Sequence, residues 1–181
     1  TDKTRAIMVV HTMGKPCDME KIGYIAGKHN LHVIEDSCEA HGAKYKSEFI
    51  GKFGDMATFS FYAAHLICSG EGGMISTKSE KIAKIINSIR THGRRDGKMY
   101  FDHERFGMNA KMNDLEASLG LEGIFNFWET FKKRKQNLNY LLETNKDLQN
   151  FAFFNKEEPY EDTCPHAFSI TLKNPKYFSV D

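Results

Sequence analysis

Apolar runs and helical patterns alternate at the start of the chain. Residues 6–12 are almost continuously apolar, which is typical of a strand buried on both faces. Asp18 can cap the helix that follows, because apolar residues keep helical spacing from there to about Asn30. Residues 31–37 predict a second strand. A strand, a helix and a strand within about 30 residues indicate a parallel crossover unit.

The middle of the chain predicts two more strands and a second helix. The strands cover residues 55–62 and 72–77. Ser79 can cap a helix whose stripe of isoleucines ends at Gly93, a residue suited to the position just after a helix. Residues 94–107 are polar and rich in turn formers, so we expect an exposed loop there.

A long helical region follows this loop. Asn113 and Glu116 form a capping-box pattern at its start, and the helical pattern continues to about Leu148. Gly120 and Gly123 predict a kink or a break within it.

The C-terminal part predicts a second structural unit. Residues 151–154 and 166–173 have the pattern of strands. We therefore expect a domain boundary near residue 125, with one unit over residues 1–125 and another over residues 126–181.

Composition narrows the class of protein. The chain has 181 residues, of which 40% are hydrophobic, so it can bury a core and is not a disordered chain. Its formal net charge of +1 argues against nucleic acid or an anionic membrane as the main partner. No apolar run approaches the roughly 20 residues that span a bilayer, and no signal peptide opens the chain. We expect a cytoplasmic protein that does not insert into a membrane.

The cysteines and the chain ends add two expectations. The four cysteines form no CxxC pair, which favours free thiols in a reducing compartment over a zinc site or a disulfide framework. The chain lacks an initial methionine, enters an apolar strand almost at once and stops just after another strand-like run. We therefore expect a fragment of a longer protein.

Two acids close the second predicted strand, Glu35 and Asp36. Ligands of open α/β sheets bind outside the carboxyl ends of the strands, where an acid can hold a cationic ring nitrogen or a ribose hydroxyl. Taken alone, this pair is better explained as a helix cap or a turn acid.

A histidine stands between the strand over 55–62 and the Gly-rich turn SGEGG. His65 has an unperturbed pKa of about 6.5, which suits a general base, although a hydrogen-bonded core histidine is the commoner explanation. Ser60 can offer a hydroxyl to a phosphate, or it is a plain strand hydroxyl. The turn permits close backbone approach to a ligand or simply joins two strands. It matches neither GxGxxG nor the P-loop pattern, which disfavours nucleotide triphosphates.

The remaining histidines and the basic run do not indicate a functional site. His41, His92 and His103 are scattered and form no HExxH pattern, so no metal site is predicted. The KKRK run over residues 132–135 is best explained as a solvated helix face.

Several separated motifs together resemble one family. They are AIMVVHTMGKPCDMEKI, the stretch from VIEDSCEAHGAKY to SGEGGMIST, IRTHG, and RFGMNAKMNDLEASLGLEGI. In this order and spacing they resemble the DegT-like family of pyridoxal-phosphate (PLP) enzymes that act on keto sugar nucleotides. The resemblance covers most of residues 5–148. It implies an α/β type I aminotransferase fold, with a mostly parallel sheet and flanking helices. Residues 1–125 would be part of the large PLP-binding domain, and residues 126–181 the interdomain helix and the start of a smaller α+β domain.

The resemblance also implies roles for individual residues. Asp36 would pair with the pyridine nitrogen of the cofactor and keep it protonated, so that the ring can accept electrons. Ser60 would bind the cofactor phosphate. Asn109 would reach that phosphate from the other subunit of a homodimer with shared active sites. Glu39 stands where the family often has a glutamine near the cofactor oxygen.

His65 is the main departure from the family. Its aminotransferases have a lysine here that binds PLP covalently, and no lysine lies between Lys52 and Lys78 in this chain. A histidine at this position resembles the 3-dehydratase branch, in which the cofactor is held non-covalently and works as pyridoxamine phosphate (PMP). The resemblance implies C3 dehydration of a 4-keto-6-deoxy sugar nucleotide, with His65 as acid and base and glutamate as a possible amino donor.

Other functions stay open at this point. A sugar-nucleotide aminotransferase would tolerate the histidine or use a lysine from elsewhere. A degenerate homologue, or a dimerisation module without catalysis, would explain the loss of the lysine, although Asp36 and Ser60 are retained. A nucleotide-binding α/β domain of another kind is disfavoured by the missing phosphate-loop motifs.

Overall fold

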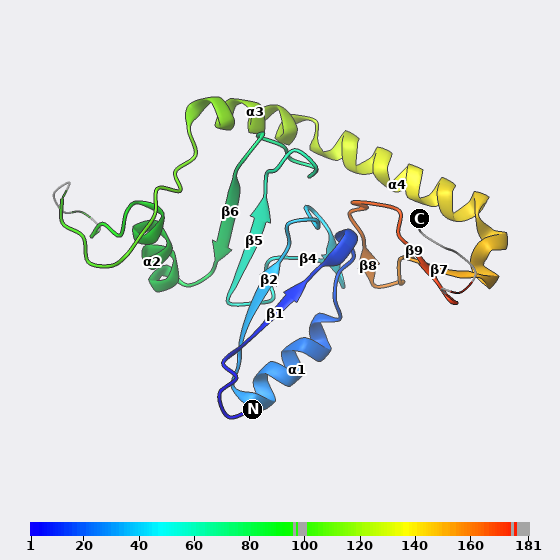
Figure 1. Cartoon of the computed structure of the whole chain (residues 1–181), viewed down its shortest axis with the longest axis horizontal. Helices are drawn as coiled ribbons and strands as arrows, with labels where there is room; N and C mark the ends of the chain where they lie inside the picture. Colours follow the sequence, from blue (N-terminus) through cyan, green and yellow to red (C-terminus); the bar gives the residue numbers. More distant parts are fainter. Residues whose placement is uncertain (96, 98–100, 175, 177–181) are drawn as a thin grey trace.

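The computed structural model describes residues 1–95, 97, 101–174 and 176, and at its centre lies a four-stranded sheet (Figure 1). The strands follow one another across the sheet in the order β1 (Ala6–Val10), β2 (His32–Asp36), β5 (Met56–Ser60) and β6 (Gly73–Thr77). Strand β2 pairs in parallel with both β1 and β5, and β6 is antiparallel to β5. The predicted α/β class with a mostly parallel sheet is confirmed.

Helix α1 (Met19–His29) makes the predicted crossover between β1 and β2. The Asp18 carboxylate caps it by accepting a hydrogen bond from the Lys21 N–H at 3.1 Å. The helix ends at Asn30, which adopts the left-handed conformation with a φ of 51°. Both ends therefore follow from local sequence signals.

Helix α2 (Glu80–Arg90) begins as predicted, since the Ser79 hydroxyl accepts from the Ile82 N–H at 3.3 Å. Its end differs by one residue from the prediction. His92, not Gly93, follows the C-cap residue in the left-handed conformation, with a φ of 63°. The Gly93 N–H donates to the Ser88 carbonyl at 2.7 Å, which is one of the two bonds of a Schellman motif, while the His92 N–H donates to the Met108 carbonyl at 2.8 Å.

Part of the loop predicted over 94–107, residues 96 and 98–100, lies outside the described residues. Its described part contains one antiparallel bridge, between Arg94 and His103, and the Phe106 side chain is almost fully exposed.

The predicted long helical region is two helices, α3 (Asp114–Phe125) and α4 (Phe127–Thr144). The capping box at its start is confirmed. The predicted break exists, but it falls at Asn126 rather than at the glycines. Gly120 and Gly123 instead let α3 approach the segment 67–69, and a Cβ atom on Gly123 would lie 3.2 Å from the Cys68 nitrogen.

The C-terminal segment forms small antiparallel pairings. The strands β7 (Ala152–Phe154) and β9 (Ile170–Leu172) pair with each other, as their sequence pattern predicts. A second sheet was not predicted and joins β4 (Glu48–Phe49), β3 (Lys44–Tyr45) and β8 (Glu161–Asp162). This sheet fastens the segment beyond α4 to the first unit. The predicted boundary near residue 125 stays a prediction.

The core lies between α1, the sheet, the segment 40–50 and α4. Buried apolar side chains from each of these elements meet there: Val9, Met19, Ala26, Val33, Ala40, Ala43, Tyr45, Ile50, Leu66, Phe131 and Cys164. In contrast, α3 has no buried residue, and its Leu115 and Phe125 are each 80% exposed. In the part of the chain that the structure describes, no helix is both long enough and apolar enough to cross a membrane.

A tight turn after β1 clamps the C-terminal segment. The 3-10 helix η1 (Thr12–Gly14) ends at Gly14, which has a φ of 77°. The Gly14 carbonyl accepts from the Cys164 N–H at 3.0 Å, and the Met13 carbonyl accepts from the His166 N–H at 3.2 Å. A Cβ atom on Gly14 would lie only 1.6 Å from the Cys164 carbonyl oxygen.

We expect Gly14→Ala to destabilise the full-length protein. The left-handed backbone alone costs a non-glycine residue about 1–3 kcal/mol, and the clash with Cys164 adds to this loss. Gly23→Ala is the matched control, because Gly23 lies within α1 with nothing within 4 Å of its Cβ position. That change should stabilise the protein by about 0.5–1 kcal/mol. Urea unfolding measures the free energy of unfolding of both variants. If Gly14→Ala is as stable as the wild type, the close contact between Gly14 and Cys164 does not stabilise the fold.

Candidate active site

The carboxyl ends of three parallel strands meet at one edge of the sheet. Asp36 is the last residue of β2 and pairs in register with Val10 of β1 and Thr58 of β5. Ser60 is the last residue of β5. The structure therefore brings Asp36 and Ser60 to the edge where ligands of open α/β sheets bind, as the sequence predicts.

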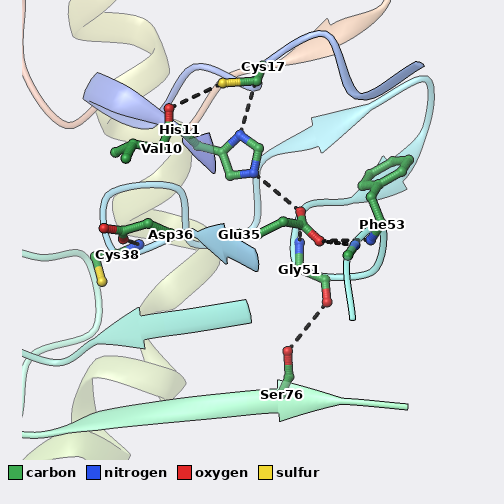
Figure 2. Close-up of polar contacts among 10 residues, drawn as sticks. Val10, His11, Cys17, Glu35, Asp36, Cys38, Gly51, Phe53 and Ser76 are labelled. Carbon is green, nitrogen blue, oxygen red and sulfur yellow. Dashed lines mark hydrogen bonds and ion pairs between the residues drawn. The ribbon is translucent and has the colours of Figure 1, made fainter. Parts of the chain in front are cut away.

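The acid next to Asp36 has a structural role. The Glu35 side chain is fully buried and accepts three backbone hydrogen bonds, from Gly51 at 2.8 Å, Phe53 at 2.9 Å and Gly54 at 2.7 Å (Figure 2). The sequence allowed the acidic pair to be a ligand-binding site, a helix cap or a turn acid, and Glu35 is a turn acid. Its carboxylate holds the turn over residues 51–54 against the end of β2.

A buried histidine completes the partners of Glu35. His11 Nε2 lies 3.3 Å from Glu35 Oε2, and His11 Nδ1 accepts from the Cys17 N–H at 3.0 Å (Figure 2). Because Nδ1 is an acceptor here, the ring proton stands on Nε2 and is donated to Glu35. The Cys17 thiol in turn donates to the Val10 carbonyl at 3.2 Å. The network ties the end of β1 to the end of β2.

Burial by itself raises the pKa of Glu35. The hydrogen bonds from His11 and from the Gly54 and Gly51 N–H groups outweigh this effect, so the pKa lies below its ordinary value of 4.5. Glu35 is therefore an anion at neutral pH, as its acceptor-only contacts require.

Successive strand residues point to opposite faces, so Glu35 and Asp36 face away from each other (Figure 2). Asp36 Oδ1 accepts from the Cys38 N–H at 3.2 Å. Burial, followed by the neighbouring Asp36, raises the pKa of the Cys38 thiol to about 11. Cys38 thus stays a thiol at neutral pH and is unsuited to act as a nucleophile.

His65 lies in the segment after β5, where its N–H donates to the Tyr62 carbonyl at 3.0 Å. Its Nδ1 atom is buried and has no hydrogen-bond partner within the described residues. Burial first, and then the charge of His166, lower the pKa of His65, while the charges of Glu39 and Asp36 act in the opposite direction. His65 is a neutral imidazole near neutrality, as a general base has to be.

Two further histidines surround His65. The ring centroid of His41 lies 6.0 Å from that of His65, and the centroid of His166 lies 5.3 Å away. His41 is buried, its Nδ1 accepts from the Ile67 N–H at 3.4 Å, and burial lowers its pKa to about 4. Sequence patterns did not indicate this proximity, because His41 and His65 are far apart along the chain and only the fold brings their rings together.

Glu39 connects this cluster to the turn after β1. Its Oε2 accepts from the Met13 N–H, and its Oε1 lies 3.7 Å from His166 Nε2. The sequence did not single out His166. The only signal for it was a position at the edge of a predicted strand, and contacts between residues 39 and 166 are invisible to local patterns.

Ser60 and Asn109, the two residues predicted to bind the cofactor phosphate, have different surroundings. Ser60 Oγ accepts from the Tyr62 N–H at 3.2 Å, which leaves its hydroxyl hydrogen for an acceptor such as a phosphate oxygen. Asn109 is exposed and forms a bridge with Thr91. Among the residues that the structure describes, no hydrogen bond or ion pair joins it to Ser60 or His65. The charges of Asp36 and Glu39 act on His65, and Ser60 ends the strand that pairs with β2.

A mostly parallel sheet, with an acid, a hydroxyl and a histidine at or beyond the carboxyl ends of its strands, fits the class of proteins with the type I aminotransferase fold. Solved structures support this class. The chain superposes on an Escherichia coli GDP-4-keto-6-deoxy-D-mannose-3-dehydratase with bound hydrated PLP with a TM-score of 0.86, at 28% identity over 96% of this chain and 48% of that one. The Helicobacter pylori aminotransferase PseC gives a TM-score of 0.88, at 25% identity over 97% of this chain and 47% of that one.

The particular family follows from the sequence match. Residues 1–180 match the DegT/DnrJ/EryC1/StrS aminotransferase family, and the chain belongs to it. It is 35% identical to the lipopolysaccharide biosynthesis protein RfbH of Salmonella typhimurium over 96% of this chain and 45% of RfbH. The chain spans less than half the length of the curated relatives it matches. Its relatives include both dehydratases and aminotransferases, and the latter are more numerous.

We expect Glu35→Gln to lower the free energy of unfolding of the full-length protein by about 1–3 kcal/mol at pH 7, because the amide NH₂ cannot accept the buried N–H bonds that the carboxylate accepts. Glu48→Gln, which removes an exposed pair with Lys52, should cost at most about 0.5 kcal/mol. Denaturant unfolding compares the two variants.

The same pair of proteins tests the charge of Glu35 through pH. Since the pKa of Glu35 is lower in the folded state, its contribution is present above about pH 4.5 and is lost as the pH falls through the folded-state value. The stability difference between wild type and Glu35→Gln should therefore shrink below pH 4.5. A difference that stays constant from pH 7 to pH 3.5 would argue against an ionised Glu35.

Proposed function

We propose that the full-length protein binds PLP and PMP and removes the C3 hydroxyl of a 4-keto-6-deoxy sugar nucleotide, with His65 as the acid and base. The observation that carries this proposal is His65 itself. By the resemblance of the surrounding motifs it stands where the family's aminotransferases have their cofactor-binding lysine, and its buried Nδ1 has no protein partner among the described residues. An imidazole cannot hold PLP covalently, but it can take up and release a proton near neutral pH.

The residues at the edge of the sheet fit the cofactor. The Asp36 carboxylate uses Oδ1 for the Cys38 N–H and can hold a protonated pyridine nitrogen with its other oxygen. The free hydroxyl hydrogen of Ser60 can bind the phosphate. Glu39 lies where a group near the cofactor oxygen is expected, and Asn109 would reach the phosphate site of a partner subunit in a homodimer. When bound, the pyridine ring supplies an electron sink for a carbanion.

His65 then has two proton transfers to make. With the cofactor bound, it would take up a proton at the cofactor's C4′ carbon and would give that proton to the C3 hydroxyl of the sugar. The C3–O bond would break and the hydroxyl would leave as water, while the pyridine ring would carry the electron pair between the two positions. The same residue serves first as base and then as acid, so its pKa should lie near the working pH. Its neutral state in the structure fits the first of these steps. Glutamate is the proposed amino donor that restores PMP.

Transamination of a sugar nucleotide is the second candidate, because the fold matches PseC as closely as it matches the 3-dehydratase. It would tolerate the histidine or would use a lysine from another part of the full-length protein to bind PLP. A homologue without catalysis, or a dimerisation module, would need no cofactor at all.

The first test is chemical trapping on full-length protein. We expect PLP to bind, as seen by absorbance, and borohydride reduction followed by mass spectrometry to find no pyridoxyl-lysine. His65→Lys should produce that adduct on residue 65. An adduct in the wild type would favour the aminotransferase, and a failure to bind PLP or PMP would favour the non-catalytic homologue.

The second test is turnover of GDP-4-keto-6-deoxymannose with glutamate and the full-length protein. We expect a 3-deoxy sugar, and His65→Asn should lower the rate by about 10²–10⁴-fold, the usual contribution of a positioned acid–base group. His29→Asn, an exposed change at the end of α1, is the matched control and should leave the rate unchanged. An amino sugar that retains the C3 hydroxyl would contradict the dehydratase.

A further inference from the structure

We propose that His11 is a positioning residue for Asp36: it ties the end of β2 to the end of β1 and so sets where the Asp36 carboxylate meets the pyridine nitrogen of a bound cofactor. This inference deepens the proposed function and rests on it in one respect only, that Asp36 binds this nitrogen. Its evidence is the set of hydrogen bonds around His11, which reaches the strand of Asp36 through its backbone and through its ring.

The backbone of Asp36 is held from both sides of its strand. The His11 N–H, one residue beyond β1, donates to the Asp36 carbonyl at 3.0 Å, and the Ser37 N–H donates to the Thr58 carbonyl of β5 at 2.9 Å. The Asp36 carbonyl and the Ser37 N–H belong to one planar peptide group, which also includes the Asp36 Cα atom. One bond to each neighbouring strand therefore fixes the orientation of the peptide group from which the Asp36 side chain projects.

The ring of His11 fixes the place of its own backbone. His11 is fully buried, and each of its four polar groups has a protein partner. Besides the bond to Asp36, its carbonyl accepts from the Gly14 N–H at 3.1 Å, its Nδ1 accepts from the Cys17 N–H at 3.0 Å, and its Nε2 lies 3.3 Å from Glu35 Oε2 (Figure 2). A displacement of the ring would break these bonds, so the N–H that reaches Asp36 stays in one position.

The bond to Glu35 strengthens the pairing at the point where it is weakest. Among the described residues β1 pairs with β2 alone, and this pairing ends at Val10 opposite Asp36. The ends of such elements open most easily. The Glu35 carboxylate gives the His11 ring a fixed partner here, because three backbone N–H groups of the turn over residues 51–54 hold it in place. Through His11 this anchor reaches the Asp36 carbonyl on the neighbouring residue.

Two substitutions separate the two bonds of the ring. In His11→Gln the amide group extends to the position of Nε2 and can donate to Glu35. In His11→Asn the amide oxygen stands near the position of Nδ1, so it can still accept from Cys17 but cannot reach Glu35. We therefore expect His11→Asn to displace Asp36 and His11→Gln to preserve its position. The exposed change His29→Asn at the end of α1 is the matched control.

The test measures the affinity of the full-length variants for two ligands by absorbance titration. One ligand is PLP, and the other is the analogue in which a C–H group replaces the pyridine nitrogen and cannot bind Asp36. We expect His11→Asn to weaken PLP binding by about 10–100-fold, the range that the loss of an outer-shell partner produces at metal sites. Binding of the analogue should not change. His11→Gln and His29→Asn should bind both ligands as the wild type does.

A second measurement tests whether the effect passes through Asp36. In an Asp36→Ala background, His11→Asn should weaken PLP binding no further, because two changes that act through the same contact are not additive. An equal loss for PLP and the analogue in His11→Asn, or a further loss in the Asp36→Ala background, would show general damage to the site and would overturn the proposal.

The remaining outcomes also decide the proposal. Unchanged PLP binding in His11→Asn overturns it, and so does a failure of both His11 variants to fold, which would make His11 a structural residue. A wild type that binds no PLP overturns this inference together with the proposed function. A wild type that binds PLP without removing the C3 hydroxyl contradicts only the dehydratase, since the comparison of the two ligands needs no sugar substrate.

Discussion

A single buried carboxylate, that of Glu35, sets the geometry of the whole sheet edge. A charge without solvent has to find its partners inside the protein, and here three backbone N–H groups and one imidazole provide them. These partners come from the end of β1 and from the turn over residues 51–54, so satisfying the charge draws both against β2. Because successive side chains of a strand point to opposite faces of the sheet, fixing Glu35 on one face places the Asp36 carboxylate on the other.

The region around His65 is built in a second layer on this frame. The turn that follows His11 carries Met13 and Gly14, which hold Glu39 and the segment Cys164–His166. Residues that are far apart in sequence thereby meet at one histidine. The C-terminal segment does more than begin another domain, because it delivers a side chain to the neighbourhood of the site.

Local signals predicted the elements well and long-range contacts poorly. The caps at Asp18, Ser79 and Asn113 were readable because each is a hydrogen bond within three residues. The helix breaks at Asn126 and not at the predicted glycines. Gly120 and Gly123 lie inside α3, where their lack of a side chain lets the segment 67–69 pack closely against the helix. The sheet of β3, β4 and β8 was missed because its strands are two residues long.

The site divides in the same way. Asp36, Ser60 and His65 were predicted from motifs that lie along one continuous stretch, and the fold brings Asp36 and Ser60 to the carboxyl ends of neighbouring strands. The proximity of His41 and His166 to His65 depends on tertiary packing, which no pattern within a short window can report. Within the described residues Asn109 makes no hydrogen bond with Ser60 or His65, and its predicted role involves a second subunit.

Helix α3 rests on the segment beyond His65 with almost no side chain between them, since a Cβ on Gly123 would lie only 3.2 Å from the Cys68 nitrogen and 3.4 Å from Ile67 Cα. The contact leaves no room for a side chain, so a larger residue at position 123 would have to displace α3 from residues 67–68. The place of α3 in the fold, with its exposed Leu115 and Phe125, therefore depends on a glycine that lies next to a point two residues beyond His65.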